Sequence, residues 1–116
     1  MDEKLENLFI EACIKHGEGT ESGDSKKANK AVKNIFKVVT HLKNHNNLSA
    51  LFNYLDHENE SVRLWSAAYL LVIDQDGRAL NTIKNLTGKP KLSVSFSAEI
   101  TLKEWEKGSL KMYYLN

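Results

Sequence analysis

Two stretches of the chain, residues 48–73 and 78–107, carry the same order of apolar side chains at a fixed separation of 31 residues. Each stretch has apolar residues at the three-to-four-residue spacing of an amphipathic helix, a short polar break, and then a second such run. Three positions of the first run and four of the second correspond in the two stretches: Leu48, Phe52, Leu55, Trp65, Ala67, Tyr69 and Leu71 with Ala79, Ile83, Leu86, Phe96, Ala98, Ile100 and Leu102. A helix-turn-helix unit that recurs at such a period predicts a helical repeat array.

The residues before this repeat predict a third pair of helices. The match is weaker: at an offset of 36 residues, Ala28, Ala31 and Ile35 fall on Leu64, Ala67 and Leu71. One proline and six glycines in 116 residues leave few chain breakers, which favours long helices. We therefore predict an all-α fold, a short right-handed stack of three helical hairpins of HEAT type, in one domain over residues 1–116. Five of the six expected helices cover about 2–15, 48–55, 60–73, 78–86 and 93–107, with Gly108 closing the last. The second helix is long: it begins near Asp24 or Ser25, after the break at "HGEGTESGD", and ends at "KNHNN".

The helix expected at residues 60–73 is apolar on nearly every side. "SVRLWSAAYLL" places Leu64, Trp65 and Leu71 around its circumference, with Ala67 and Ala68 between them. A helix that is hydrophobic all round belongs in the interior of a fold. We expect it to be the second helix of the middle hairpin, with Asn59 as its N-cap.

Composition sets limits on the compartment and the class of protein. The chain is 41% hydrophobic and 27% charged, as ordinary globular proteins are. Cys13 is the only cysteine, which excludes an internal disulfide and fits a reducing compartment. "MDEKLENLF" has no apolar core of a secretory signal, and no apolar run has the roughly 20 residues of a membrane span. We expect a cytoplasmic protein without membrane contact.

The net charge is +1, but the charged residues are distributed unevenly along the sequence. Residues 1–24 carry seven acidic residues against two lysines, whereas residues 25–47 carry six lysines and no acidic residue. The two helices can attract each other, or the second can offer a basic face to a partner. Four of its lysines recur at steps of four, three and four residues, which places them on one helix face: Lys26, Lys30, Lys33 and Lys37.

This row of lysines has three interpretations: a solvated face, a contact for an acidic protein, and a contact for the phosphates of duplex DNA. The near-zero net charge and the presence of only two arginines, Arg63 and Arg78, weigh against nucleic acid. We also take no aromatic residue to lie among the lysines, as stacking on the bases of a single strand would require. Nucleic acid is therefore the second choice.

Three motifs resemble a known family. They are "GDSKKANK" at 23–30, "LFNYLDHENESVRLWSAAYLL" at 51–71 and "LKEWEKGSL" at 102–110, and the segment at 51–71 resembles a HEAT-type repeat unit. Together they are similar to a family of short bacterial proteins classed as a domain of unknown function, the one numbered twenty-nineteen. The likeness spans about residues 5–110 and implies no catalytic residues. Small bacterial HEAT-like relatives include immunity proteins that neutralise a toxin domain, so the resemblance implies a partner-binding module.

Arg63 and Tyr69 belong to the expected middle hairpin. Arg63 lies on the first turn of its helix, where it can bind helix termini or carboxylates such as Asp56 and Asp74, or reach an acidic group of a partner. The repeat pattern favours the structural role. We nonetheless include Arg63 and Tyr69, with the four lysines, in a predicted binding surface on the concave side of the stack.

Few residues suggest catalysis or metal binding. His41 and His45 have i, i+4 spacing but lie at a fraying helix end, without a third ligand. Asp74, Asp76, Glu58 and Glu60 fall where carboxylates cap helices, and Cys13 lies on an apolar helix face. We expect no enzyme activity, no metal and no cofactor.

The C-terminal aromatic residues Trp105, Tyr113 and Tyr114 can either seal the end of the stack or form an exposed contact. Sealing is the preferred interpretation. In sum, the sequence predicts a non-enzymatic protein-interaction module, with an immunity role against a toxin domain as one form of it and DNA-backbone binding as the alternative.

Overall fold

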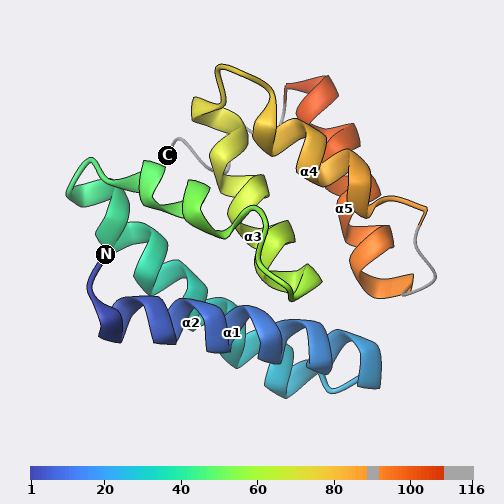
Figure 1. Ribbon diagram of the computed structural model, residues 1–116. Helices are drawn as coiled ribbons and strands as arrows, with labels where there is room; N and C mark the ends of the chain where they lie inside the picture. The colour runs from blue at the N-terminus through green and yellow to red at the C-terminus, as the bar shows by residue number, and fades with distance from the viewer. Residues whose placement is uncertain (89–91, 109–116) are drawn as a thin grey trace. The chain divides into compact units, whose positions relative to one another are not determined.

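The computed structural model describes residues 1–88 and 92–108, and every regular element in these ranges is a helix (Figure 1). The fold class predicted from the apolar spacing is confirmed. The elements are α1 (Glu3–Ser22), α2 (Ser25–Asn44), the 3₁₀ helix η1 (Leu48–Tyr54), α3 (Glu60–Leu70), the 3₁₀ turn η2 (Leu71–Ile73), α4 (Arg78–Leu86) and α5 (Leu92–Lys107).

The chain divides into two units, Met1–Ala50 and Leu51–Asn116. The first is a hairpin in which α1 and α2 pack along each other, and in the second α4 packs against both α3 and α5. The pairing of α1 with α2 and of α4 with α5 agrees with the first and the last of the expected hairpins. The single domain over 1–116, the HEAT type and the right-handed stack remain predictions.

The core of the first unit comes from the two predicted apolar stripes. Phe9, Ala12 and Cys13 of α1 are at most 3% exposed, and so are Ile35 and Leu42 of α2. Because these residues recur at helical spacing, each helix presents one apolar face to the other.

The end of α1 was predicted wrongly. The glycines of "HGEGTESGD" were expected to break the helix near Lys15, but α1 continues through Gly17 and Gly19 to Ser22. A glycine inside a helix costs about 1 kcal/mol relative to alanine, so the helix tolerates these residues for a reason. At Gly19 the reason is the approach of α2: a Cβ atom there would lie 2.8 Å from the backbone nitrogen of Ala28.

Gly23 and Asp24 turn the chain from α1 into α2. Gly23 adopts a left-handed conformation with φ of 74°, and its N–H donates to the Gly19 carbonyl. The Asp24 N–H donates to the same carbonyl at 2.8 Å, and the Asp24 carboxylate accepts from the Lys27 N–H at 3.1 Å as the N-cap of α2. A left-handed glycine followed by a capping aspartate ends one helix and starts the next within two residues.

Helix α3 is buried on almost all sides, as predicted. Val62, Ala67 and Leu70 are fully buried, and Tyr69 is 2% exposed, as is Leu71 directly after the helix. The predicted N-cap is confirmed as well, because the Asn59 side chain accepts from the N–H groups of Ser61 and Val62.

The 31-residue correspondence holds only in part. Ala67 and Ala98 are both fully buried, whereas Phe96 is 63% and Ile100 45% exposed, in contrast to buried Tyr69 and half-buried Trp65. The predicted α-helix at 48–55 is a 3₁₀ helix, with i to i+3 hydrogen bonds such as that from the Leu55 N–H to the Phe52 carbonyl. At seven residues, η1 is longer than the three or four residues that 3₁₀ helices usually span.

The C-terminal end of α5 matches the expected boundary. Gly108 has φ of 82°, and its N–H donates to the carbonyl of the half-buried Trp105. Tyr113 and Tyr114 lie outside the described residues. Among the described helices, none has the length and apolar content needed to cross a membrane.

We expect Gly19→Ala to lower the free energy of unfolding by about 1–3 kcal/mol, although the change raises helix propensity, because the new methyl group would overlap the backbone of α2. Urea unfolding followed by circular dichroism measures the difference. Thr20→Ala, at the exposed neighbouring position, gains propensity without the overlap and should be neutral or stabilising. Equal stabilisation by both substitutions would contradict the close approach.

Candidate functional site

The exposed face of α2 carries the four lysines predicted from their spacing. Lys26, Lys30, Lys33 and Lys37 are all exposed, opposite the stripe of α2 that packs against α1. We call this row the lysine face. Eleven residues separate its ends, so it extends about 16 Å along the helix at the usual rise per residue.

No member of the lysine face forms an ion pair or a hydrogen bond through its side chain within the described part of the chain. Lysines three and four residues apart on a helix repel one another by a few tenths of a kcal/mol per pair. The face therefore keeps its positive charge without neutralisation by neighbouring carboxylates.

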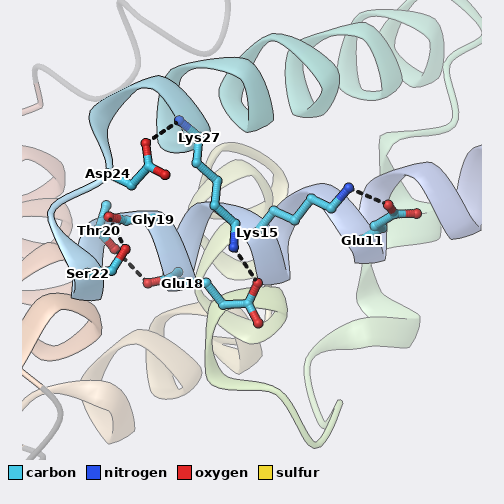
Figure 2. Close-up of polar contacts among 9 residues, drawn as sticks. Glu11, Lys15, Glu18, Gly19, Thr20, Ser22, Asp24 and Lys27 are labelled. Atoms are coloured by element: carbon cyan, nitrogen blue, oxygen red, sulfur yellow. Dashed lines mark hydrogen bonds and ion pairs between the residues drawn. The ribbon is translucent and has the colours of Figure 1, made fainter.

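Two other lysines of the first unit are paired, and they show what the lysine face lacks (Figure 2). Lys15 contacts Glu11 along α1 at 2.6 Å, and Lys27 of α2 reaches across to Glu18 of α1 at 3.0 Å. Lys15 holds the pKa of the Glu11 carboxyl below its usual value. The attraction predicted between acidic α1 and basic α2 is thus carried, among the described residues, by the Lys27–Glu18 pair.

Phe36 lies beside the lysine face, between Lys33 and Lys37 in the sequence, so the prediction that no aromatic residue accompanies the lysines is wrong. Its side chain is 50% exposed, although α2 buries apolar residues directly before and two residues after it, Ile35 and Val38. At 100° per residue, Phe36 falls on the flank of the helix next to Lys33, outside the buried stripe. Placing the aromatic residues of α2 on a helical wheel would have found it.

A groove between α1 and α2 borders the other side of the lysine face. Its volume is about 560 Å³, and Leu8, Ala12, Ala31, Lys26 and Lys30 are among the residues that line it. Two members of the lysine face therefore also form the rim of a concavity in the first unit.

Arg63 has a structural role in the second unit. Its guanidinium donates to the backbone carbonyls of His57 at 2.5 Å and Glu58 at 3.1 Å, which lie in the turn before α3. The expected contacts with Asp56 or Asp74 are not among its hydrogen bonds; the acceptors are carbonyl oxygens that the turn leaves without helical partners.

Tyr69 belongs to the core of the second unit. It is 2% exposed, and its ring stacks on that of Trp65 with centroids 6.2 Å apart. The sequence analysis placed it on the predicted binding surface, near the four lysines. Its burial corrects that placement, since a side chain inside the core offers no surface to a partner.

The carboxylates considered for catalysis include two that cap a helix, as expected. Asp74 accepts from the Leu80 N–H and Asp76 from the Arg78 N–H, both in the first turn of α4. Asp76 also pairs with the Arg78 guanidinium at 3.3 Å. These bonds explain why carboxylates are found in the turn before α4.

Histidine and cysteine occupy positions set by packing. The rings of His41 and His45 stack with centroids 4.2 Å apart at the C-terminal end of α2, and the His45 ring contacts the His41 carbonyl. Cys13 is fully buried, and burial raises the pKa of its thiol. Within residues 1–88 and 92–108, no three histidine, cysteine, aspartate or glutamate side chains form a group that could hold a metal ion.

Comparison with protein-family models matches residues 3–106 to a family described as "Domain of unknown function (DUF2019)". This range includes every helix of the described chain apart from the last residue of α5. The chain belongs to the DUF2019 family. The comparisons with curated proteins and with solved structures gave no significant match.

The DUF2019 resemblance rested in part on "GDSKKANK", and the structure separates its residues by role. Gly23, Asp24 and Ala28 form the corner and the close contact between α1 and α2. Lys26 and Lys30 take no part in that corner and are exposed. The motif thus combines residues that shape the hairpin with residues that are available to a partner.

We expect His16 to give this DUF2019 protein a pH-dependent stability. Half-burial lowers the pKa of His16 below its usual value of 6.5, so the unfolded chain binds the proton first as the pH falls. Stability is therefore highest above pH 6.5 and declines as the pH drops from there toward the folded-state pKa. Urea titrations between about pH 5 and 8 should show this slope in the wild type, and it should be much smaller in His16→Gln.

The lowered pKa of Glu11 acts in a separate window, below its usual value of 4.5, and does not overlap this range. An unchanged slope in His16→Gln would assign the pH dependence to other groups.

Proposed function

We propose that this DUF2019 protein is a non-enzymatic binding module that holds an acidic protein partner on the lysine face of α2. The observation that carries the proposal is the row of four exposed lysines without a carboxylate partner in the described chain. The positive electrostatic potential of such a row of charges steers a partner of opposite charge toward an interface and disfavours partners of like charge.

Phe36 favours a protein over a nucleic acid as that partner. Interface hot spots combine a buried aromatic or apolar anchor with surrounding polar contacts. A half-exposed phenylalanine beside Lys33 and Lys37 supplies such an anchor next to charged groups. The phosphate backbone of a duplex offers no apolar pocket for this ring.

A toxin domain that the protein neutralises is the partner class suggested by the immunity proteins among small HEAT-like relatives. Such a complex would form in the cytoplasm, where a lone thiol stays reduced. Arg63 and Tyr69 are not part of the proposed contact, because their side chains serve the turn before α3 and the core.

Duplex DNA is the second candidate, since lysines at steps of three and four residues can also contact successive phosphates. Contacts of this kind are independent of sequence and lost steeply with added salt. Fluorescence anisotropy of a labelled random duplex, at low salt and then with increasing salt, separates the two candidates. We expect no binding at low salt; tight, salt-sensitive binding would favour DNA.

Charge reversal of the lysine face should abolish partner binding while the fold is kept. With the protein as bait in an extract of its native cells, we expect Lys26→Glu, Lys30→Glu, Lys33→Glu and Lys37→Glu together to reduce recovery of the partner at least ~10-fold, the loss of about 1.4 kcal/mol or more. The matched control reverses four lysines that are exposed elsewhere, Lys4, Lys84, Lys103 and Lys107. Equal recovery by the fourfold variant and the wild type would exclude the lysine face as the contact.

Phe36→Ser should weaken the same complex ~10-fold, because a hot-spot aromatic contributes more than about 1 kcal/mol. The unfolding free energy should change by less than about 1 kcal/mol, since the ring is half exposed. Ile100→Ser removes a comparably exposed apolar side chain from α5 and serves as the control. Normal binding by Phe36→Ser would remove the anchor from the proposal.

A further inference from the structure

The groove between α1 and α2 has an apolar floor made by small side chains. Ala12 and Ala31 are each 3% exposed, and Leu8 is half buried beside them. Because alanine fills little space between two packed helices, the line along which α1 and α2 meet stays open as a shallow valley. Its floor could accommodate apolar side chains brought from outside.

The rim of the groove is charged, and its free charges are positive. The carboxylates at the rim are already engaged: Glu11 pairs with Lys15, and Asp24 caps α2 through the Lys27 N–H. Lys26 and Lys30 line the same groove and have no ionic or hydrogen-bonding partner among the described residues. An occupant with carboxylates along its flank would neutralise these two lysines.

The length and direction of the groove suit a helix. Its α1 wall runs from Leu8 to Lys15 and its α2 wall from Lys26 to Asn34, which corresponds to about 10–12 Å along each helix. A third helix packs naturally along the valley between two neighbouring helices, with its side chains in their grooves. Two turns of an incoming helix would span this distance.

We propose that the groove is the binding site for an amphipathic helix of the partner protein. The small apolar residues of that helix lie on Ala12 and Ala31, and its aspartates or glutamates reach Lys26 and Lys30. This inference rests on the proposed function, because both lysines also belong to the lysine face, and it adds which structural element of the partner binds and where. The apolar floor disfavours a phosphate backbone as the occupant, since charged phosphates would lose solvation there without gaining a polar contact.

The test uses a designed probe and the full chain. The probe is a 15-residue helical peptide with alanine and leucine on one face and glutamate on both flanks, and the control peptide carries lysine in place of each glutamate. Titration of the ¹⁵N-labelled protein should give saturable shifts with the acidic peptide, centred on residues 8–15 and 26–34. The lysine peptide should give none.

Two pairs of substitutions separate the groove from the rest of the lysine face. Lys26→Glu with Lys30→Glu should weaken peptide binding at least tenfold, whereas Lys33→Glu with Lys37→Glu, outside the groove lining, should change it less than threefold. Asn34→Trp fills the groove without altering charge and should also prevent binding, with the fold checked by circular dichroism.

Three results would overturn the proposal: absence of saturable shifts, shifts centred elsewhere, or equal loss with both lysine pairs. Analytical ultracentrifugation tests a further alternative. Concentration-dependent dimers that Asn34→Trp abolishes would show that a second copy of the chain occupies the groove, and would also overturn the proposal. If the peptide does not bind in the groove, the proposed function can still be tested separately, because recovery of the native partner depends on all four lysines.

Discussion

The contact between Gly19 and Ala28 determines the geometry of the first unit. With no side chain at Gly19, the first turn of α2 comes within 2.8 Å of where a Cβ atom would be. The left-handed Gly23 and the Asp24 cap reverse the chain in two residues directly beside this contact. Because the buried stripe of α2 must then face α1, the lysines half a turn away are directed outward, and one close approach sets both the packing and the orientation of the charged face.

Charge contributes little to holding the two helices together. Residues 1–24 are acidic and residues 25–47 basic, yet one ion pair between α1 and α2, Lys27–Glu18, is formed by the described residues, and its two side chains are 39% and 59% exposed. Exposed pairs of this kind contribute about 0–1 kcal/mol each. Apolar burial around Phe9, Ile35 and Leu42 therefore stabilises the unit, and most of the basic charge of α2 is left for contacts outside it.

The sequence predicted those features that depend on local spacing. Apolar periodicity identified the helices, and capping preferences identified the N-cap at Asn59 and the closing Gly108, because each of these features depends on residues within one or two turns. Prediction from the sequence failed where packing against residues distant in the sequence determines the structure. Gly17 and Gly19 resembled helix breakers until α2 was placed against α1, and the repeat alignment assigned similar environments to Tyr69 and Ile100, of which only the first is buried.

The proposed binding surface was likewise predicted only where it depends on local spacing. The spacing of the four lysines placed them on one face correctly, whereas the groove beside them depends on how α1 and α2 pack, which no single helix encodes. Phe36 escaped notice because it lies just outside the stripe that periodicity selects.

The burial of Cys13 has a practical value for studying this surface. It is the only cysteine in the chain, it is fully enclosed, and its thiol is held in the unreactive protonated form. A cysteine introduced at an exposed position of α2 would thus be the single site open to maleimide dyes or spin labels under native conditions. Fluorescence and distance measurements on the lysine face can begin from the natural sequence, without first replacing a native thiol.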